Sequence, residues 1–281
     1  MAPLLSIVVP TRNEASNIGA CLSCLAAAMA RGQVETIVVD NHSTDDTAAI
    51  AAAAGARVFE QGPERSAQRN RGWREATAPW VIFLDADMRL PEATLDEILR
   101  RTAAPGAPDA LYVREKRVGN SWWIRVRDFE RSFYDGTCID ALRIFRKTLL
   151  EKTGGYDQDL SAFEDWDLDI QCADAGAKTA ITDEALLHDE GAFTWRRHLR
   201  KKDYYSGFAD RYVAKWGAGH PALKRQLGMR YRFFGVFAEN GKWRRVLRHP
   251  LLFACVLLDR FLVGATFLLS RKRQRTSAEL K

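Results

Sequence analysis

The sequence predicts an α/β protein in which a mostly parallel sheet is flanked by helices. Short apolar runs at residues 4–9, 34–39 and 80–84 have the unbroken hydrophobicity of strands that are buried on both faces. Segments of helical composition separate such runs, so strand and helix alternate four times in the first half of the chain. Each run ends at a polar cluster, and ligands of parallel sheets bind outside the carboxyl ends of the strands. We therefore expect one polar crevice at this edge of the sheet.

The elements of the first half follow in order. Residues 14–30 are rich in Ala and Leu, with Ser16 and Asn17 available as N-caps, which predicts a helix. We expect strands at residues 4–9, 34–39, 57–60 and 80–84, and helices at residues 14–30, 45–54, 66–76 and 91–101. A linker rich in Pro, Gly and Ala at residues 103–108 then leads into the second half.

The second half carries weaker signals. We expect strands at residues 110–117, 141–145 and 178–181, helices at residues 122–133 and 164–175, and a turn at residues 153–157. The later helix opens with Glu164 and Asp165, and acidic side chains suit the N-terminus of a helix.

Charge divides the chain more sharply than its net value of +6 indicates. Residues 196–281 contain 21 Lys/Arg against 5 Asp/Glu, a balance of +16, which leaves residues 1–195 at −10. We expect two parts, a domain at residues 1–195 and a basic, partly apolar helical extension at residues 196–281. A basic extension suits an anionic surface such as phospholipid headgroups, and a merely solvated basic face is the alternative.

Apolar segments in the extension favour a location on a membrane surface. Residues 251–258 and 261–269 are apolar, and Asp259 and Arg260 interrupt them. A charged pair at mid-span opposes insertion across a bilayer, and basic residues flank the segments on both sides. We expect helices that lie on or dip into the inner leaflet, anchored by apolar burial and by anionic lipid. The alternative is a helix through which the chain forms oligomers in solution.

The cysteines favour a reducing compartment. Cys21 and Cys24 form a single C-x-x-C pair with neither a second pair nor a His cluster at ligand spacing, so we expect no metal framework. The odd count of five cysteines and the lack of a signal-peptide pattern favour the cytosol. We expect a cytoplasmic protein, peripheral or monotopic on the inner face of the cell membrane.

Two carboxylates follow the apolar run at residues 80–84. Asp85 and Asp87 are separated by the small Ala86, and alternate side chains of an extended segment point the same way. Two oxygen ligands suit Mg²⁺ or Mn²⁺ holding a diphosphate, because such ions keep waters and phosphates in their coordination shell. A lone Asp-x-Asp is a weak signal, and an acidic turn after a strand is the alternative.

Four ordered motifs carry a resemblance to a known family. They are the segments 6–14 (SIVVPTRNE), 38–45 (VVDNHSTD), 83–87 (FLDAD) and 163–168 (FEDWDL). In order and spacing they resemble glycosyltransferase family 2, whose members are inverting enzymes of the GT-A fold. The similarity covers residues 4–190 and is greatest to enzymes that act on lipid-linked or cell-envelope glycans.

The resemblance implies a donor site for a nucleotide sugar, with a nucleotide half at about residues 1–102 and an acceptor half at about 109–195. The implied nucleotide-sugar contacts are Pro10, Thr11, Arg12, Glu14, Asp40, Arg65, Gln68, Asp85 and Ala86. A strand-end carboxylate can accept hydrogen bonds from ribose hydroxyls, and the planar guanidinium of Arg65 suits a diphosphate. For Arg69 and Arg71, a position on a charged surface helix is as good an interpretation as contact with the nucleotide.

The resemblance also implies a metal site and a catalytic base. Asp87 is the expected direct ligand of Mg²⁺ or Mn²⁺, with Asp85 as its partner and His188 as a third ligand after a predicted strand. Asp165 resembles the base that deprotonates the acceptor hydroxyl, with Glu164 as the residue that positions it. Contacts to the acceptor or diphosphate are expected from Trp166, Trp195, Arg200 and Lys201.

The leading hypothesis is a metal-dependent inverting glycosyltransferase of the hexosyltransferase type. Its donor is a nucleoside-diphosphate sugar, and its acceptor is a hydroxyl of a lipid-linked or cell-surface glycan. One alternative is a polyprenyl-phosphate sugar synthase, whose acceptor is a lipid phosphate. A sugar-nucleotide pyrophosphorylase fits less well, because residues 10–14 contain no glycine. A nucleic-acid-binding protein also fits less well, because residues 1–195 carry a balance of −10.

Overall fold

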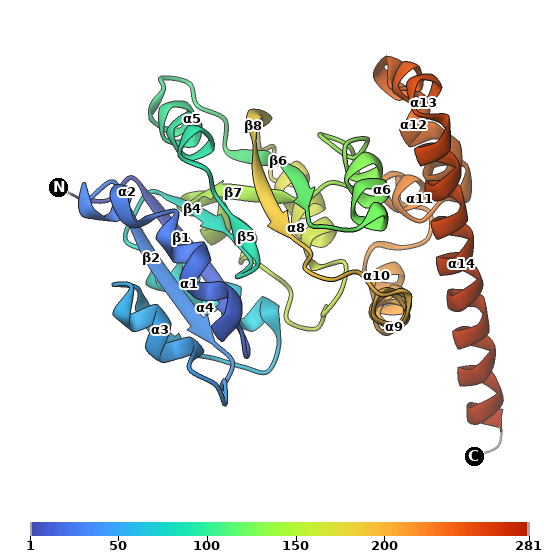
Figure 1. Ribbon diagram of the computed structural model, residues 1–281, viewed down its shortest axis with the longest axis horizontal. Coiled ribbons are helices and arrows are strands. Elements are labelled where there is room, and N and C mark those ends of the chain that lie inside the picture. The colour runs from blue at the N-terminus through green and yellow to red at the C-terminus, as the bar shows by residue number, and fades with distance from the viewer. Residues whose placement is uncertain (1, 280–281) are drawn as a thin grey trace. The chain divides into compact units, whose positions relative to one another are not determined.

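The chain forms two compact units in the computed structural model (Figure 1). The structure describes residues 2–279, and their side chains except at positions 202, 205, 206 and 267–279. The first unit comprises Met1–Lys116 and Ile139–Asp189, and the second comprises Arg117–Cys138 and Glu190–Lys281. The domain boundary expected at residue 195 and the two halves within residues 1–195 stay predictions about functional organisation.

The first unit contains a mixed sheet with the strand order β3-β2-β1-β4-β7-β6-β8-β5. The strands are β1 (Leu5–Thr11), β2 (Val34–Asp40), β3 (Arg57–Glu60), β4 (Trp80–Phe83), β5 (Met88–Arg89), β6 (Ala110–Val118), β7 (Leu142–Arg146) and β8 (Thr179–Asp189). Strands β1 to β4 are parallel, whereas β7 runs antiparallel to β4 and β6, and β5 runs antiparallel to β8. The predicted α/β class with a mostly parallel sheet flanked by helices is confirmed.

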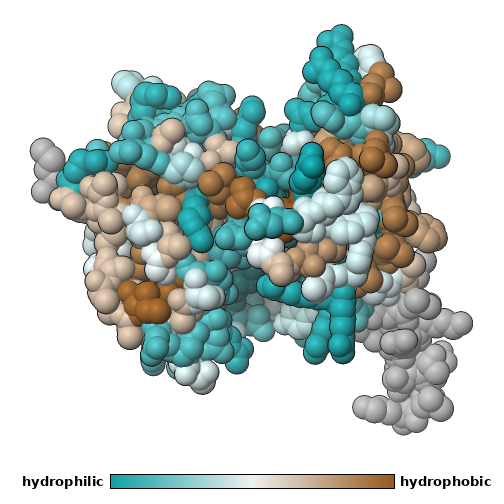
Figure 2. All heavy atoms as spheres, viewed as in Figure 1, coloured by the Kyte–Doolittle hydropathy of each residue, from teal (hydrophilic) through white to brown (hydrophobic). Residues whose placement is uncertain are grey.

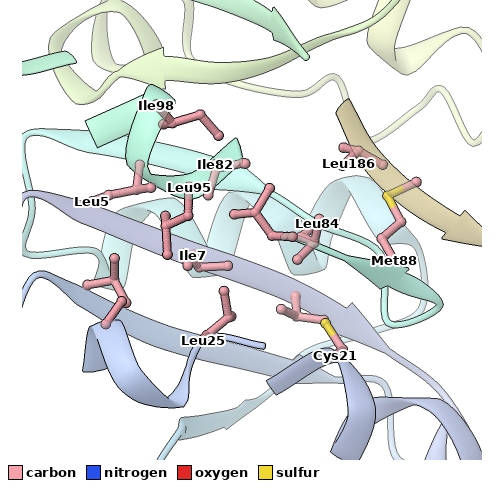
Figure 3. Packing of buried hydrophobic residues seen from close by; sticks show 14 of the residues in the cluster. Leu5, Ile7, Cys21, Leu25, Ile82, Leu84, Met88, Leu95, Ile98 and Leu186 are labelled. Carbon is pink, nitrogen blue, oxygen red and sulfur yellow. The ribbon is translucent and has the colours of Figure 1, made fainter. Parts of the chain in front are cut away.

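Helices cover both faces of this sheet. They are α1 (Ala15–Ser23), α2 (Ala26–Ala30), α3 (Thr47–Ala53), α4 (Arg65–Glu75), α5 (Glu92–Ala103), α7 (Lys147–Thr153) and α8 (Glu164–Asp174). Side chains of a strand alternate between faces, so Ile7 and Ile82 pack with Leu25 and Leu95 in one buried cluster (Figure 3). Val8 lies in the other cluster, together with side chains of α4, α7 and α8. This double burial explains why the strands read as unbroken apolar runs.

Three local predictions were wrong or incomplete. Residues 14–30 form two helices, because the N–H of Leu25 bonds to the carbonyl of Leu22 in a tight turn that lets both leucines reach the core. Strand β8 continues to Asp189 instead of ending at residue 181, because it pairs there with β5. Helix α7 was not predicted.

The second unit is helical. It contains α6 (Trp122–Arg131), α9 (Trp195–Ser206), α10 (Ala209–Trp216), α11 (Pro221–Gln226), α12 (Val236–Ala238), α13 (Trp243–Arg248) and α14 (Pro250–Glu279). The interruption at Asp259 and Arg260 does not divide α14, because both side chains are buried and paired inside the unit. Asp259 Oδ1 lies 2.9 Å from His198 Nε2, and Arg260 Nε donates to Glu130 Oε1 at 2.7 Å. Within residues 2–279, no helix combines the length and the apolarity that a membrane span requires.

Close packing of α4 on β1 gives a test of the core. A Cβ atom at Gly72 would lie 2.2 Å from Val8 Cγ1 in the centre of the sheet. We expect Gly72→Ala to lower the free energy of unfolding by about 2 kcal/mol, because the well-packed strand has little room to move. Urea denaturation measures this change.

Gly19→Ala is the matched control. Gly19 also lies in a helix, but its added Cβ would make an ordinary 3.5 Å contact with Ile50. There the higher helix propensity of Ala should keep or raise stability by up to about 1 kcal/mol. Equal effects of the two substitutions would contradict the close contact at Gly72.

Candidate active site

The carboxyl ends of β1 and β2 are joined by polar side chains. Thr11 Oγ1 donates to Asp40 Oδ1 at 2.8 Å, and the N–H and hydroxyl of Ser43 also donate to the Asp40 carboxylate. From α4, the Gln68 side-chain amide donates to the carbonyl oxygens of Thr11 and Val39 at 2.9 and 2.6 Å. Asp40 and Gln68 are both buried, so each holds the strand ends in place, and their contact with a nucleotide stays a prediction.

The remaining residues of the first motif differ in exposure. Pro10 is buried in β1, whereas Arg12 is exposed just beyond its end. Glu14 is half-buried and accepts a hydrogen bond from Asn17 Nδ2 at 2.7 Å. Arg12 is therefore accessible to a ligand.

The Asp85-Ala86-Asp87 segment is a turn and not an extended strand. β4 ends at Phe83, and the N–H of Met88 donates to the carbonyl of Asp85 at 2.9 Å. Ala86 and Met88 are buried in the first core cluster, and their burial draws the chain into this turn. The extended backbone expected for this segment was wrong, whereas a shared cavity for the two carboxylates stays a prediction. The nearest partners of Asp87 and Asp85 differ.

Asp87 faces His188 because β5 pairs with β8. In this ladder Met88 lies opposite His188, and the N–H of Asp189 donates to the carbonyl of Asp87 at 2.9 Å. His188 Nε2 lies 3.3 Å from Asp87 Oδ2, and His188 Nδ1 lies 2.8 Å from Glu115 Oε1. Burial would lower the pKa of His188, but its hydrogen bonds to these two carboxylates outweigh burial and raise the pKa above its usual value.

The pair of Asp87 and His188 suits a divalent cation. Asp87 Oδ1 is buried and accepts no hydrogen bond from any described residue. A buried carboxylate oxygen without a donor is available as a ligand for a cation. The Glu115 contact orients the His188 ring, as carboxylates commonly do for metal-binding histidines. No group of three or more His, Cys, Asp or Glu side chains within the described part of the chain is arranged to hold a metal. A cation here would therefore complete its shell with substrate phosphates and water, as Mg²⁺ usually does.

Asp85 meets a buried guanidinium. Arg69 on α4 has a side chain only 3% exposed, and its Nη2 lies 3.2 Å from Asp85 Oδ1. Its Nη1 lies 3.1 Å from Asp165 Oδ1 and 3.5 Å from Glu164 Oε1, at the start of α8. One buried cation thus joins the end of β4 to the first turn of α8.

The pKa values of two carboxylates beside this guanidinium shift in opposite directions. Burial would raise the pKa of Asp85, but the facing Arg69 outweighs burial and holds the pKa well below its usual range. The pKa of Glu164 is raised, because burial and the neighbouring Asp165 outweigh the same guanidinium. Asp165 keeps 35% of its side chain exposed, so it is the more accessible acid of this pair.

Arg69 and Glu115 are the site residues that sequence reasoning missed. Arg69 was assigned no role, although the spacing of Arg65, Gln68 and Arg69 places all three on one side of α4. Arg65 is 41% exposed and lies 4.0 Å from Glu164, while Arg71 pairs with Glu75 on the surface. No local signal in the sequence marks Glu115, which contacts His188 from strand β6.

The expected acceptor contacts are divided between the two units. Trp166 lies on α8, with its ring 5.3 Å from that of Phe163. Trp195, Arg200 and Lys201 lie on α9, where Trp195 packs against Trp123 at 4.4 Å and the two basic residues are exposed. Their contacts with an acceptor or a diphosphate stay predictions.

The sequence pattern of glycosyl transferase family 2 matches residues 6–160. A PGL/p-HBAD biosynthesis glycosyltransferase of Mycobacterium bovis is 32% identical over 271 residues, which cover 91% of this chain and 97% of the relative. The succinoglycan biosynthesis protein ExoA of Rhizobium meliloti is 29% identical over 64% of this chain and 61% of its own. The chain therefore belongs to glycosyl transferase family 2 and is a glycosyltransferase.

Two solved structures share the fold. S. aureus TarS 1–349 in complex with UDP-GlcNAc is 20% identical, with a TM-score of 0.60 over 94% of this chain and 81% of the 1–349 fragment. The mannosyltransferase PcManGT from Pyrobaculum calidifontis, in complex with GDP-Man and Mn²⁺, is 20% identical, with a TM-score of 0.58 over 99% of this chain and 85% of its own.

Loss of the buried guanidinium should unfold the site. We expect Arg69→Gln to lower the free energy of unfolding by about 3 kcal/mol, because it leaves buried acids without their cation. Urea denaturation measures the effect. Arg65→Gln is the matched control, because the Arg65 side chain is 41% exposed and lies 4.0 Å from Glu164. It should contribute less than about 1 kcal/mol to the free energy of unfolding. A similarly small effect at Arg69 would show that the cluster does not depend on it.

Proposed function

We propose that the protein is a metal-dependent inverting glycosyltransferase. It transfers a sugar from a nucleoside-diphosphate sugar to a hydroxyl group of a lipid-linked or cell-surface glycan. One observation carries the proposal: buried Arg69 brings the strand-end carboxylate Asp85 and the accessible acid Asp165 to the same place. Such a reaction requires the side of the site that binds the donor to lie close to the base.

The relatives support the two substrates. The similar folds of TarS and PcManGT hold UDP-GlcNAc and GDP-Man, which supports a nucleotide sugar as donor. Relatives named for PGL/p-HBAD and succinoglycan biosynthesis support a cell-envelope glycan or glycolipid as acceptor.

Asp87 and His188 would hold the cation, which as a Lewis acid would stabilise the charge of the leaving diphosphate. Mn²⁺ in the PcManGT complex supports this assignment. Arg65 is exposed at the start of α4, where its guanidinium would bind diphosphate oxygens. Thr11, Arg12, Glu14 and Asp40 would line the nucleotide side at the ends of β1 and β2.

Asp165 would act as the base. Arg69 holds Oδ1 of this carboxylate, so the other oxygen can take the proton of the acceptor hydroxyl. The freed oxygen attacks the anomeric carbon as the bond from that carbon to the diphosphate oxygen breaks, which inverts the configuration in one displacement. Buried Glu164 positions Asp165 and does not itself accept the proton.

We also propose that the protein associates with a membrane surface. The balance of +16 over residues 196–281 supports attraction to an anionic leaflet on the cytoplasmic side. Asp259 and Arg260 are paired within the second unit, so the centre of α14 does not expose these charges to lipid. The basic residues that follow position 270 in the sequence are not among the residues whose side chains the structure describes.

The metal site can be tested with donor turnover. Wild-type protein, incubated with a panel of nucleotide sugars and Mn²⁺, should release nucleoside diphosphate from at least one of them. Asp87→Ala should lower this rate by about 100-fold or more, and chelation should act likewise. Asp96→Ala on the exposed face of α5 is the matched control. No turnover with any donor, or full activity of Asp87→Ala, would reject the proposed reaction.

The role of the base distinguishes the two classes of acceptor. For a hydroxyl acceptor, Asp165→Asn should lower the transfer rate at least about 100-fold, because the proton then has no acceptor. Asp174→Asn, exposed at the other end of α8, should leave the rate unchanged. Transfer that survives Asp165→Asn would instead indicate a lipid phosphate acceptor, which is already ionised at neutral pH.

A further inference from the structure

The second unit has an apolar hollow beside α13. The hollow has a volume of about 240 Å³, and apolar side chains line it, including Phe234, Phe237, Trp243, Val246, Leu247 and Phe253. We call this feature the aromatic hollow. Neither the donor site nor the proposed base uses any of these residues.

The rim of the aromatic hollow is exposed. Phe234 and Leu247 are 71% and 70% exposed, and Trp243 is about half exposed. Leu251, four residues after Leu247, is also exposed at the start of α14. Figure 2 shows hydrophobic side chains gathered over the region of α12 to α14. Contiguous exposed apolar patches of this kind mark surfaces that bind a partner or a membrane.

Basic residues are frequent in the segment that forms this rim. Residues 229–251 contain six Lys/Arg and a single acid, Glu239, which already accepts hydrogen bonds from Arg225 and Tyr231. On α13 the spacing places Trp243, Val246 and Leu247 on one face, while Arg244 and Arg248 are exposed beside it. Apolar side chains with Trp at their edge and Arg alongside are typical of segments in the interface of an anionic bilayer.

The charges select among the possible partners. A second copy of this chain would bring the same basic rim against the first, and like charges oppose that contact. An anionic headgroup layer neutralises the rim, and the acyl region beneath it accepts Phe234, Trp243 and Leu247. We propose that the aromatic hollow and its basic rim form the surface by which this protein docks on an anionic phospholipid bilayer. This inference rests on the membrane association proposed above.

Docking falls on Phe234 just before α12, on α13 and on the first turn of α14, and not farther along α14. In the first half of α14, Asp259 and Arg260 are buried and paired with residues of α9 and α6, so this part of the helix packs within its own unit. Beside this pair, Leu258 and Phe261 are exposed on α14, with 48% and 67% of their surfaces accessible; Phe261 is the more exposed of the two. It is as apolar and as exposed as Phe234, and it does not line the hollow, so it provides a matched control.

Vesicle flotation with the full-length protein tests the docking surface. The vesicles contain either phosphatidylcholine alone or equimolar phosphatidylcholine and phosphatidylglycerol. We expect wild type to bind the anionic vesicles, and the double variants Phe234→Ser/Leu247→Ser and Arg244→Glu/Arg248→Glu to bind about tenfold less. The controls Phe261→Ser and Arg100→Glu, the latter exposed on α5, should remain within about twofold of wild type. Unchanged turnover of the nucleotide-sugar donor shows that each variant is folded.

Each other outcome has a defined meaning. Binding that survives Phe234→Ser/Leu247→Ser but is lost in Phe261→Ser would overturn the inference and leave membrane association intact. If wild type binds neither kind of vesicle, both the docking surface and the membrane association are rejected. Donor turnover would still test the glycosyltransferase activity separately. A dimer in solution that Phe234→Ser/Leu247→Ser abolishes, without vesicle binding, would make the hollow an interface between copies.

Discussion

The buried guanidinium of Arg69 is the interaction on which the site depends. Three acids, Asp85, Glu164 and Asp165, lie around it within 3.5 Å. Acids gathered around one buried group oppose one another where water is largely excluded, so they remain together only around a cation. A guanidinium is well suited, because its planar fork contacts several carboxylates at once and it stays protonated.

Helix α4 supplies this cation and also fixes the strands that surround it. Gln68 ties the ends of β1 and β2 through their carbonyls, and Arg69 ties the end of β4 to α8. One turn further along, Gly72 has no side chain, which lets the helix approach Val8 closely. The same helix therefore sets the geometry of the sheet edge and neutralises the acids that gather there.

Much of this could be predicted from the sequence, because the relevant signals are local. Double-sided burial makes β1, β2 and β4 read as apolar runs, and the polar residues at their ends are visible directly. The role of Arg69 could not be predicted in the same way, because an arginine in a polar helix has the same local pattern whether it is buried or exposed. Glu115 and His188 meet only through strand pairings between segments far apart in the chain, so no motif spacing records their contact. The turn at Asp85 also follows from a distant cause, the burial of Ala86 and Met88 in the core.

Burial and pairing also change the effect of the charges in α14. In the sequence, Asp259 and Arg260 interrupt an apolar stretch and oppose its insertion into lipid. In the structure they are internal partners of His198 and Glu130, and the apolar side chains around them divide between the interior of the unit and its surface. Hydrophobicity summed along a helix therefore overstates what is available to a membrane. The available part is the set of apolar side chains that remain exposed, and around the aromatic hollow these lie beside basic residues on a short helix.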